Sequence, residues 1–277
     1  LEEHVCRPFA EAYRRGETPS PCVLCNPSVK LRLLCERADA LGAEYIATGH
    51  YARAEGGALY MGRPENDQSY MLCRILPDQL RRLLLPLGGM AKTETRELAA
   101  SLGLPAAQKP DSMELCFVPD GDYAGFIERY TGKTSRTGAF LNTAGEPIGT
   151  HRGVIHYTIG QRKGLGISAP HPLYVCGICP EQNTVTLGGS QDLFSRRLTA
   201  TDVNLISCDS LEKPVRVQAK IRYRHPEQPA TAWITPDGVL HVEFDEPQRA
   251  ITCGQAVVLY DGETVVGGGR ISSAEKS

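Results

Sequence analysis

Residues 214–225 read PVRVQAKIRYRH and carry the strongest structural pattern in the chain. Apolar and polar side chains alternate there with a period of two, which is typical of a β-strand with one buried face. The apolar positions are Val215, Val217, Ala219, Ile221 and Tyr223, and the polar ones are Arg216, Gln218, Lys220, Arg222 and Arg224. We expect the first set to face a hydrophobic core and the second, which is mainly cationic, to face solvent.

Two Asp-Gly turns follow this strand. They lie in TPDGVLHVEF (235–244) and YDGETVVGGG (260–269), and Asp-Gly between alternating apolar runs is a strong hairpin signal. Residues 201–277 are therefore predicted to form a small C-terminal β-barrel. Glycine, proline and short alternating runs also dominate residues 134–200, which we expect to form a small, mainly β central domain.

The first part of the chain, residues 1–133, instead alternates helix and strand. The expected elements are helices at 27–42, 90–104 and 121–132 and a short buried strand at 44–51. Gly42 is placed to end the first helix, and Leu98 and Leu102 fall on one face of the second. Alternating helices and strands indicate an α/β layer with a parallel sheet.

Composition limits the classes of function. The 277 residues are 41% hydrophobic and carry a formal net charge of −2, so contact with nucleic acid requires a local basic patch. No apolar run approaches the length of about 18 residues that a membrane span needs. No signal-peptide pattern opens the chain, and we expect a cytoplasmic protein without membrane contact.

Cysteine spacing is the most informative chemical feature. Ten cysteines occur, and Cys22 and Cys25 stand three apart in TPSPCVLCN (18–26). Close-set thiols in a cytosolic chain of this size indicate metal or redox chemistry. Cys116 would join them only if the fold brings it near. A second pair, Cys176 and Cys179, has no further Cys or His pair at zinc spacing, and we expect a structural role for it.

Four other stretches are ambiguous when taken singly. Gly49 and His50 end the predicted strand, where α/β sheets bind ligands, but they also suit a simple turn. Asp67 lies in a polar cluster that suits a binding site or a helix N-cap. Residues 157–166, YTIGQRKGLG, suit a phosphate-contacting loop or an exposed hairpin tip. Residues 222–224 suit an RNA-binding surface or a solvated strand face.

The order of these stretches along the chain resembles one family, the tRNA-specific 2-thiouridylases (MnmA/TrmU). The matching stretches are TPSPCVLCN, YIATGHYAR, NDQSYML, KPDSMELCFVPDGDY, GTHRGVIHYTIGQRKGLG, RYRH and GQAVVLYDGE. The resemblance implies that residues 1–133 are the C-terminal part of a PP-loop ATPase domain. The family's SGGVDS-type phosphate-binding turn does not occur within the 277 residues. We therefore expect an N-terminal segment to be missing and the chain alone to be inactive.

The resemblance also implies a reaction. ATP, with Mg²⁺, adenylates the 2-carbonyl oxygen of the wobble uridine, and a persulfide on Cys116 then attacks that carbon. Cys25 helps to release the sulfur by forming a transient disulfide with Cys116, and Gly49 matches a nucleotide-contacting position. The implied partners are tRNA and a persulfide sulfur-donor protein. We expect the protein itself to be a monomer. The residues that match tRNA-contacting positions are Ser20, Pro21, Cys22, His50, Asn66, Asp67, Gln68, Arg222, Tyr223 and Gln255.

One departure leaves the sulfur chemistry open. Many family members carry an aspartate with an acid/base role where this chain has Cys22. Three cysteines, Cys22, Cys25 and Cys116, resemble instead the ligands of a 4Fe-4S cluster whose fourth iron is open to sulfide. The three thiols suit a persulfide relay, a cluster, or structural zinc or inert thiols. For the whole chain, a non-catalytic tRNA-binding module and a thiol redox or metal-binding protein are the alternative classes.

Overall fold

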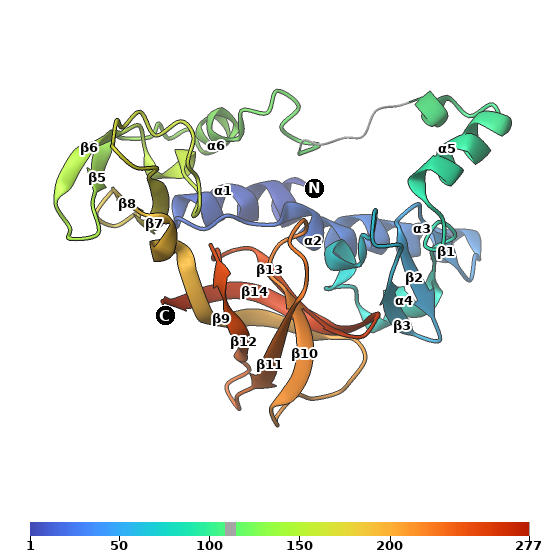
Figure 1. The fold of residues 1–277 in the computed structure, drawn as a ribbon. Helices are drawn as coiled ribbons and strands as arrows, with labels where there is room; N and C mark the ends of the chain where they lie inside the picture. Colours follow the sequence, from blue (N-terminus) through green and yellow to red (C-terminus); the bar gives the residue numbers. More distant parts are fainter. Residues whose placement is uncertain (109–114, 277) are drawn as a thin grey trace.

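A row of helices forms the N-terminal part of the protein. The computed structural model describes residues 1–108 and 115–276. The row, coloured blue, runs across the middle of the molecule in Figure 1. It comprises the π-helical turns η1 (Glu2–Cys6) and η2 (Asn26–Leu31) and the helices α1 (Arg7–Arg14), α2 (Pro21–Cys25) and α3 (Arg32–Leu41). Gly42 ends α3 in the left-handed conformation (φ 68°), as the sequence predicts.

The parallel pairing expected of an α/β layer is present but short. Strand β1 (Ile46–Ala47) pairs in parallel with β4 (Leu83–Leu84), which follows α4 (Pro77–Arg82). The strand predicted over 44–51 is thus only two residues long. Its one fully buried side chain, Ile46, packs into a core with Leu31 and Leu83.

The C-terminal part is a closed antiparallel barrel, as predicted. Its strands are β9 (Phe194–Leu205), β10 (Val215–Lys220), β11 (Gln228–Ile234), β12 (Leu240–Arg249), β13 (Ala256–Asp261) and β14 (Thr264–Lys276). They pair in the order β13-β10-β11-β12-β9-β14, and β14 pairs back with β13 to close the barrel. Both Asp-Gly sequences lie at hairpin turns, where Gly238 and Gly262 have positive φ. A hairpin, β2 (Ala52–Glu55) and β3 (Ala58–Met61), extends the sheet from β14.

The prediction for the polar face of the opening strand was partly wrong. Val217 and Ala219 are buried as expected, but β10 ends at Lys220, and Lys220 is only 9% exposed. The chain then turns, with the His225 amide donating to the Arg222 carbonyl. Strand alternation therefore stops before Arg222, whose side chain is half-buried instead of pointing outward.

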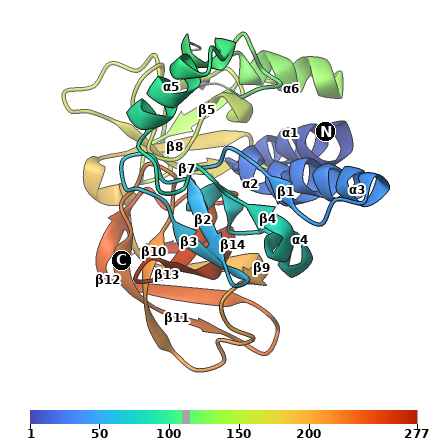
Figure 2. The ribbon, with the colours of Figure 1, turned by 90° about the vertical axis from the view of Figure 1, so that its right-hand side faces the viewer.

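The central part is a mixed four-stranded sheet beside helix α6 (Tyr123–Thr131). Its order is β6-β5-β8-β7, and β5 and β8 are parallel. Its strands are β5 (Gly138–Leu141), β6 (Pro147–His151), β7 (Tyr174–Cys179) and β8 (Thr184–Gly188). Figure 2 shows this sheet beside the barrel, with α1 and α6 next to each other. An aromatic cluster of Phe9, Phe117 and Phe126 packs α6 against α1.

The remaining helical elements are short. Helix α5 (Lys92–Ser101) forms where predicted, but Leu98 and Leu102 are 48% and 65% exposed. Single 3₁₀ turns occur at Ser69–Leu72, Pro105–Gln108, Val154–His156 and Ser190–Leu193. Among the described residues, no helix is both long and apolar enough to cross a bilayer.

Candidate active site

The cysteine pair lies on helix α2, which begins with a proline at its first position. Pro21 suits that position because its fixed φ is helical and no N–H is lost from the helix. Cys22 is exposed, whereas Cys25, one turn later, is 7% exposed. The residue Cys22 is exposed as a whole, but neighbouring atoms still desolvate its thiol, and this desolvation is the main cause that raises the pKa of both thiols. Cys116 is exposed and raises the pKa of both thiols further through electrostatic repulsion.

These interactions place Cys22, Cys25 and Cys116 in one neighbourhood, although Cys116 is about 90 residues away in the sequence. Sequence reasoning missed a fourth thiol, Cys6. It is buried, and burial raises its pKa, with Cys116 and Cys25 among the lesser causes. Cys6 lies on η1, in the same row of helices as α2, and only the fold reveals that it is near Cys25 and Cys116. None of the ten cysteines, all of which lie in the described ranges, forms a disulfide in this structure.

An iron–sulfur cluster at these thiols stays a prediction. Within residues 1–108 and 115–276, no group of three or more His, Cys, Asp or Glu side chains is arranged to hold a metal ion. The ligand set that a 4Fe-4S cluster requires from Cys22, Cys25 and Cys116 is therefore not assembled in this structure.

Lys30 supplies positive charge beside the thiols, and no sequence motif points to it. It lies on η2 and lowers the pKa of both Cys22 and Cys25. Burial, with a smaller contribution from the charge of Lys30, lowers the pKa of His50 to about 4. A pKa of about 4 leaves this imidazole neutral near pH 7. The His50 Nδ1 and the Thr48 Oγ1 lie 2.8 Å apart in a hydrogen bond.

Gly49 lies between Thr48 and His50 on the turn after β1. A Cβ atom there would meet only Leu87 Cδ1, at 3.5 Å, which is ordinary contact. Packing within the described residues does not require glycine at this position, so its predicted contact with nucleotide stays a prediction. Residues 109–114, which include most of the KPDSMEL stretch before Cys116, lie outside the described residues.

The polar cluster at 66–68 is engaged with the protein itself. The Asp67 carboxylate is buried and accepts from the Gly62 amide and from the Ser69 amide and hydroxyl, at 2.8–3.0 Å. Asn66 donates to the Met90 carbonyl, and Gln68 accepts from the Tyr51 amide. Asp67 is thus a local structural acceptor but not the predicted N-cap, because the 3₁₀ turn Ser69–Leu72 has Gln68 at that position without a side-chain cap bond. The predicted tRNA contacts stay predictions.

The predicted barrel contacts also have partners within the protein. Arg222 donates to the carbonyl oxygens of Arg249 and Ala250. The Tyr223 ring lies 6.2 Å from the ring of Tyr70. Gln255 uses its amide to bind the segment that precedes α2. In the described structure these side chains hold the barrel together or connect it to the helices.

The 157–166 loop has a different character. Its backbone turns at Gly160, Gly164 and Gly166, all with positive φ. Gln161 folds back to accept from the Thr158 amide and to donate to the Lys163 carbonyl. Arg162 and Lys163 are left exposed at the tip. They form the most accessible cationic pair among the candidate tRNA contacts.

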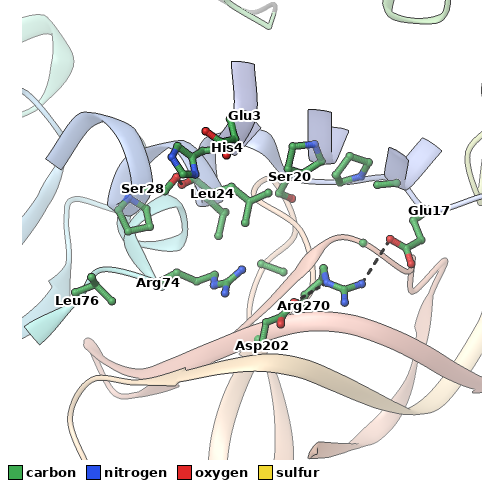
Figure 3. Close-up of a pocket in the computed structure, with 18 of the residues that line it drawn as sticks. Glu3, His4, Glu17, Ser20, Leu24, Ser28, Arg74, Leu76, Asp202 and Arg270 are labelled. Atoms are coloured by element: carbon green, nitrogen blue, oxygen red, sulfur yellow. Dashed lines mark hydrogen bonds and ion pairs between the residues drawn. The ribbon is translucent and has the colours of Figure 1, made fainter. Parts of the chain in front are cut away.

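A cavity lies beside α2, and neither Cys22 nor Cys25 is among the residues that line it. It encloses about 590 Å³ between the helix row and the barrel (Figure 3). Ser20 and Leu24 line its helical side, and Arg74 and Arg270 line the opposite side. Arg270 pairs with Asp202 and Glu17, so much of the charge in this cavity is neutralised internally.

Comparison with known proteins gives a consistent assignment. Residues 1–120 match the tRNA methyl transferase HUP domain, residues 124–189 its PRC-barrel domain, and residues 195–271 the aminomethyltransferase beta-barrel domain. The tRNA-specific 2-thiouridylase MnmA of Acetivibrio thermocellus is 47% identical over 98% of the chain and 77% of its own length. The proteins of that name from Clostridioides difficile and Moorella thermoacetica are 44% and 47% identical over 99% of the chain and 78% of theirs. The chain therefore belongs to the tRNA-specific 2-thiouridylase (MnmA/TrmU) family.

Proposed function

We propose that this protein is a sulfurtransferase that forms 2-thiouridine at the wobble position of tRNA, acting in the cytoplasm as a monomer. The observation that carries the proposal is the gathering of Cys22, Cys25 and Cys116 around one short helix in a chain of this family. ATP and tRNA are the substrates, and a persulfide-bearing protein is the sulfur source.

The reaction needs an activated carbon and a sulfur nucleophile. Transfer of AMP from ATP to the uridine 2-oxygen releases pyrophosphate and turns that oxygen into a leaving group. The terminal sulfur of a Cys116 persulfide attacks C2, and the C2–O bond breaks as AMP departs with its electron pair. Cys25 thiolate attacks the Cys116 sulfur, which breaks the persulfide bond and forms a Cys25–Cys116 disulfide. Two external thiols, or one dithiol, then reduce this disulfide through a mixed disulfide and are themselves oxidised to a disulfide.

The residues around the thiols suit this chemistry. Lys30 favours the thiolate form, which is the nucleophile, against the opposing effect of burial. Cys22 is exposed at the start of α2, where it can meet the target base, whereas Pro21 beside it is buried. Arg162 and Lys163 would hold the tRNA backbone, which supplies affinity with little sequence choice.

The test is thiolation of a tRNA transcript by the full-length protein, with ATP and a persulfide donor, followed by mass spectrometry of the nucleosides. Cys25→Ala and Cys116→Ala should each abolish 2-thiouridine formation. Cys208→Ala, which changes a half-buried thiol of the barrel, is the matched control and should retain it. Parental rates in either of the first two variants would refute the relay.

The nucleotide requirement has its own test. No SGGVDS-type motif occurs within the 277 residues, so we expect these residues alone to bind ATP weakly and not to adenylate tRNA. Calorimetric titration with ATP checks this expectation. Tight binding would contradict it.

A further inference from the structure

The segment Glu17–Ser20 leads directly into α2, and it is held by the barrel. Both ends of the Gln255 amide bind it: Nε2 donates to the Thr18 carbonyl at 2.7 Å, and Oε1 accepts from the Ser20 hydroxyl at 3.1 Å. Gln255 lies just before β13, more than 230 residues along the chain from Ser20. The barrel therefore contacts the residue that immediately precedes the cysteine helix.

Backbone contacts reinforce this attachment. The Thr18 amide donates to the Cys253 carbonyl at 2.8 Å. Gly254 has a φ of +90°, and a Cβ on it would come within 3.0 Å of the Glu17 Cβ and the Thr18 nitrogen. Only glycine permits so close an approach in that conformation. Figure 3 shows Glu17 paired with Arg270 of the barrel, with Ser20 farther along the same segment.

The segment is also bound to the central domain. The Thr18 hydroxyl donates to the Thr158 hydroxyl at 3.2 Å. Thr158 stands at the base of the 157–166 loop that carries Arg162 and Lys163. The 17–20 segment thus contacts both of the parts that are expected to hold tRNA.

Ser20 does not cap α2 with its side chain but bonds the distant Gln255. It is the N-cap of α2, where a serine side chain commonly accepts from an amide of the first turn. Its side chain makes no such cap bond, and its hydroxyl is directed to Gln255 instead. A helix of five residues has little stability of its own, so its position depends on tertiary contacts such as this one.

We infer that Gln255 is a positioning residue for sulfur transfer: it holds Ser20 and Thr18, and thereby sets where α2 presents Cys22 and Cys25 to the uridine. This inference rests on the proposed function of those thiols. It differs from the expectation, drawn from the family resemblance, that Gln255 acts through direct contact with tRNA. A contact residue would affect tRNA binding, whereas a positioning residue affects the rate once tRNA is bound.

The experiment is a double-mutant cycle in the full-length protein. Gln255→Ala, Ser20→Ala and the double variant are compared for the single-turnover rate at saturating tRNA and for the Kd of tRNA. Each single change should slow the rate roughly tenfold, the equivalent of one lost hydrogen bond that matters only to geometry. The Ser20–Gln255 bond is one of the two bonds that Gln255→Ala removes, so adding Ser20→Ala to that variant should slow the rate little further. The Kd should stay within about twofold of that of the parent.

Two further variants separate positioning from a general loss of structure. Gln255→Glu keeps an acceptor for Ser20 but cannot donate to the Thr18 carbonyl, so it should recover part of the rate. Gln218→Ala alters a half-buried barrel glutamine with no side-chain hydrogen bond among the described residues, and it should match the parent. Unfolding midpoints confirm that each variant is folded.

Several results would overturn the inference. One is a weakened Kd with an unchanged saturated rate, which would make Gln255 a tRNA contact. Another is additive loss in the double variant, and a third is a rate for Gln255→Ala equal to that of the parent. A parent that transfers no sulfur at all would refute the proposed function, and the inference with it. An active parent with unaffected Gln255 variants would refute the inference alone.

Discussion

The Arg222 side chain donates from Nη2 to the Arg249 carbonyl oxygen at 2.6 Å, which fastens the turn after β10 to the end of β12. A second bond reaches the Ala250 carbonyl at 3.2 Å. The Arg222 Nε is buried without a partner in the described residues. Arg222 is therefore part of the barrel's internal hydrogen bonding, although the sequence suggested an outward-facing cation.

Arg222→Ala should accordingly reduce the free energy of unfolding. Loss of a charged donor to buried carbonyls costs about 1–3 kcal/mol. Urea denaturation measures this change, and Lys213→Ala, an exposed change just before β10, serves as the control. A parental unfolding midpoint together with weakened tRNA binding would show that Arg222 acts on tRNA instead.

The loop tip should contribute electrostatically to tRNA binding. Lys163 is exposed, so its removal should weaken binding and flatten the dependence of log K on log salt by about 0.7–0.9. Filter binding across a salt series with Lys163→Ala measures the slope. Lys213→Ala again provides a matched loss of one exposed cation. Identical slopes in the parent and Lys163→Ala would mean that this loop does not touch phosphates.

Lys30 should set the pH range of the thiol chemistry. Lys30→Met removes a positive charge that lowers the pKa of Cys22 and Cys25, so both pKa values should rise. The thiolates would then form only at higher pH, and the acidic limb of the rate profile should move upward. The rate of iodoacetamide alkylation against pH reports the same shift. Lys30→Arg keeps the charge and should stay near the parent, and an unmoved profile in Lys30→Met would contradict the role.

Gly254 should be sensitive to any side chain. Gly254→Ala places a Cβ within 3.0 Å of the 17–20 segment and also strains a backbone at φ +90°. Gly238→Ala imposes similar strain at φ +81° with no atom within 4 Å of the new Cβ, so it isolates the contact effect. We expect both variants to lose stability, but only Gly254→Ala to lose sulfur-transfer rate as well. Equal rates in the two variants would show that the close approach has no functional consequence.

His50 should make folding stability depend on pH below neutrality. Its folded pKa of about 4 lies below the unfolded value of 6.5. Between these values the unfolded state binds more protons, so stability is lost as pH falls from about 6.5 toward 4. His50→Gln should lose less stability than the parent between pH 7 and pH 5 in urea titrations. An equal loss in both proteins would place the pH dependence on other groups.

Sequence alone determined the features that local patterns encode. The barrel followed from the alternation in residues 214–225 and from the two Asp-Gly turns, because strand period and turn chemistry depend on near neighbours. Helix ends at Gly42 and Gly132 followed for the same reason, and both glycines are left-handed caps. The family was identifiable from the order of its motifs.

Tertiary structure decided where those patterns stop and what the polar residues contact. Alternation predicted an exposed Lys220, but the strand ends there and the side chain packs 6.0 Å from the Tyr223 ring. The influence of Lys30 on His50 joins η2 to the turn after β1, whereas its influence on Cys25 acts across only five residues of the helical row. The bond between Ser20 and Gln255 joins residues 235 positions apart. Local periodicity carries no information about a pair such as Ser20 and Gln255, because the two residues meet only when separate parts of the chain pack together.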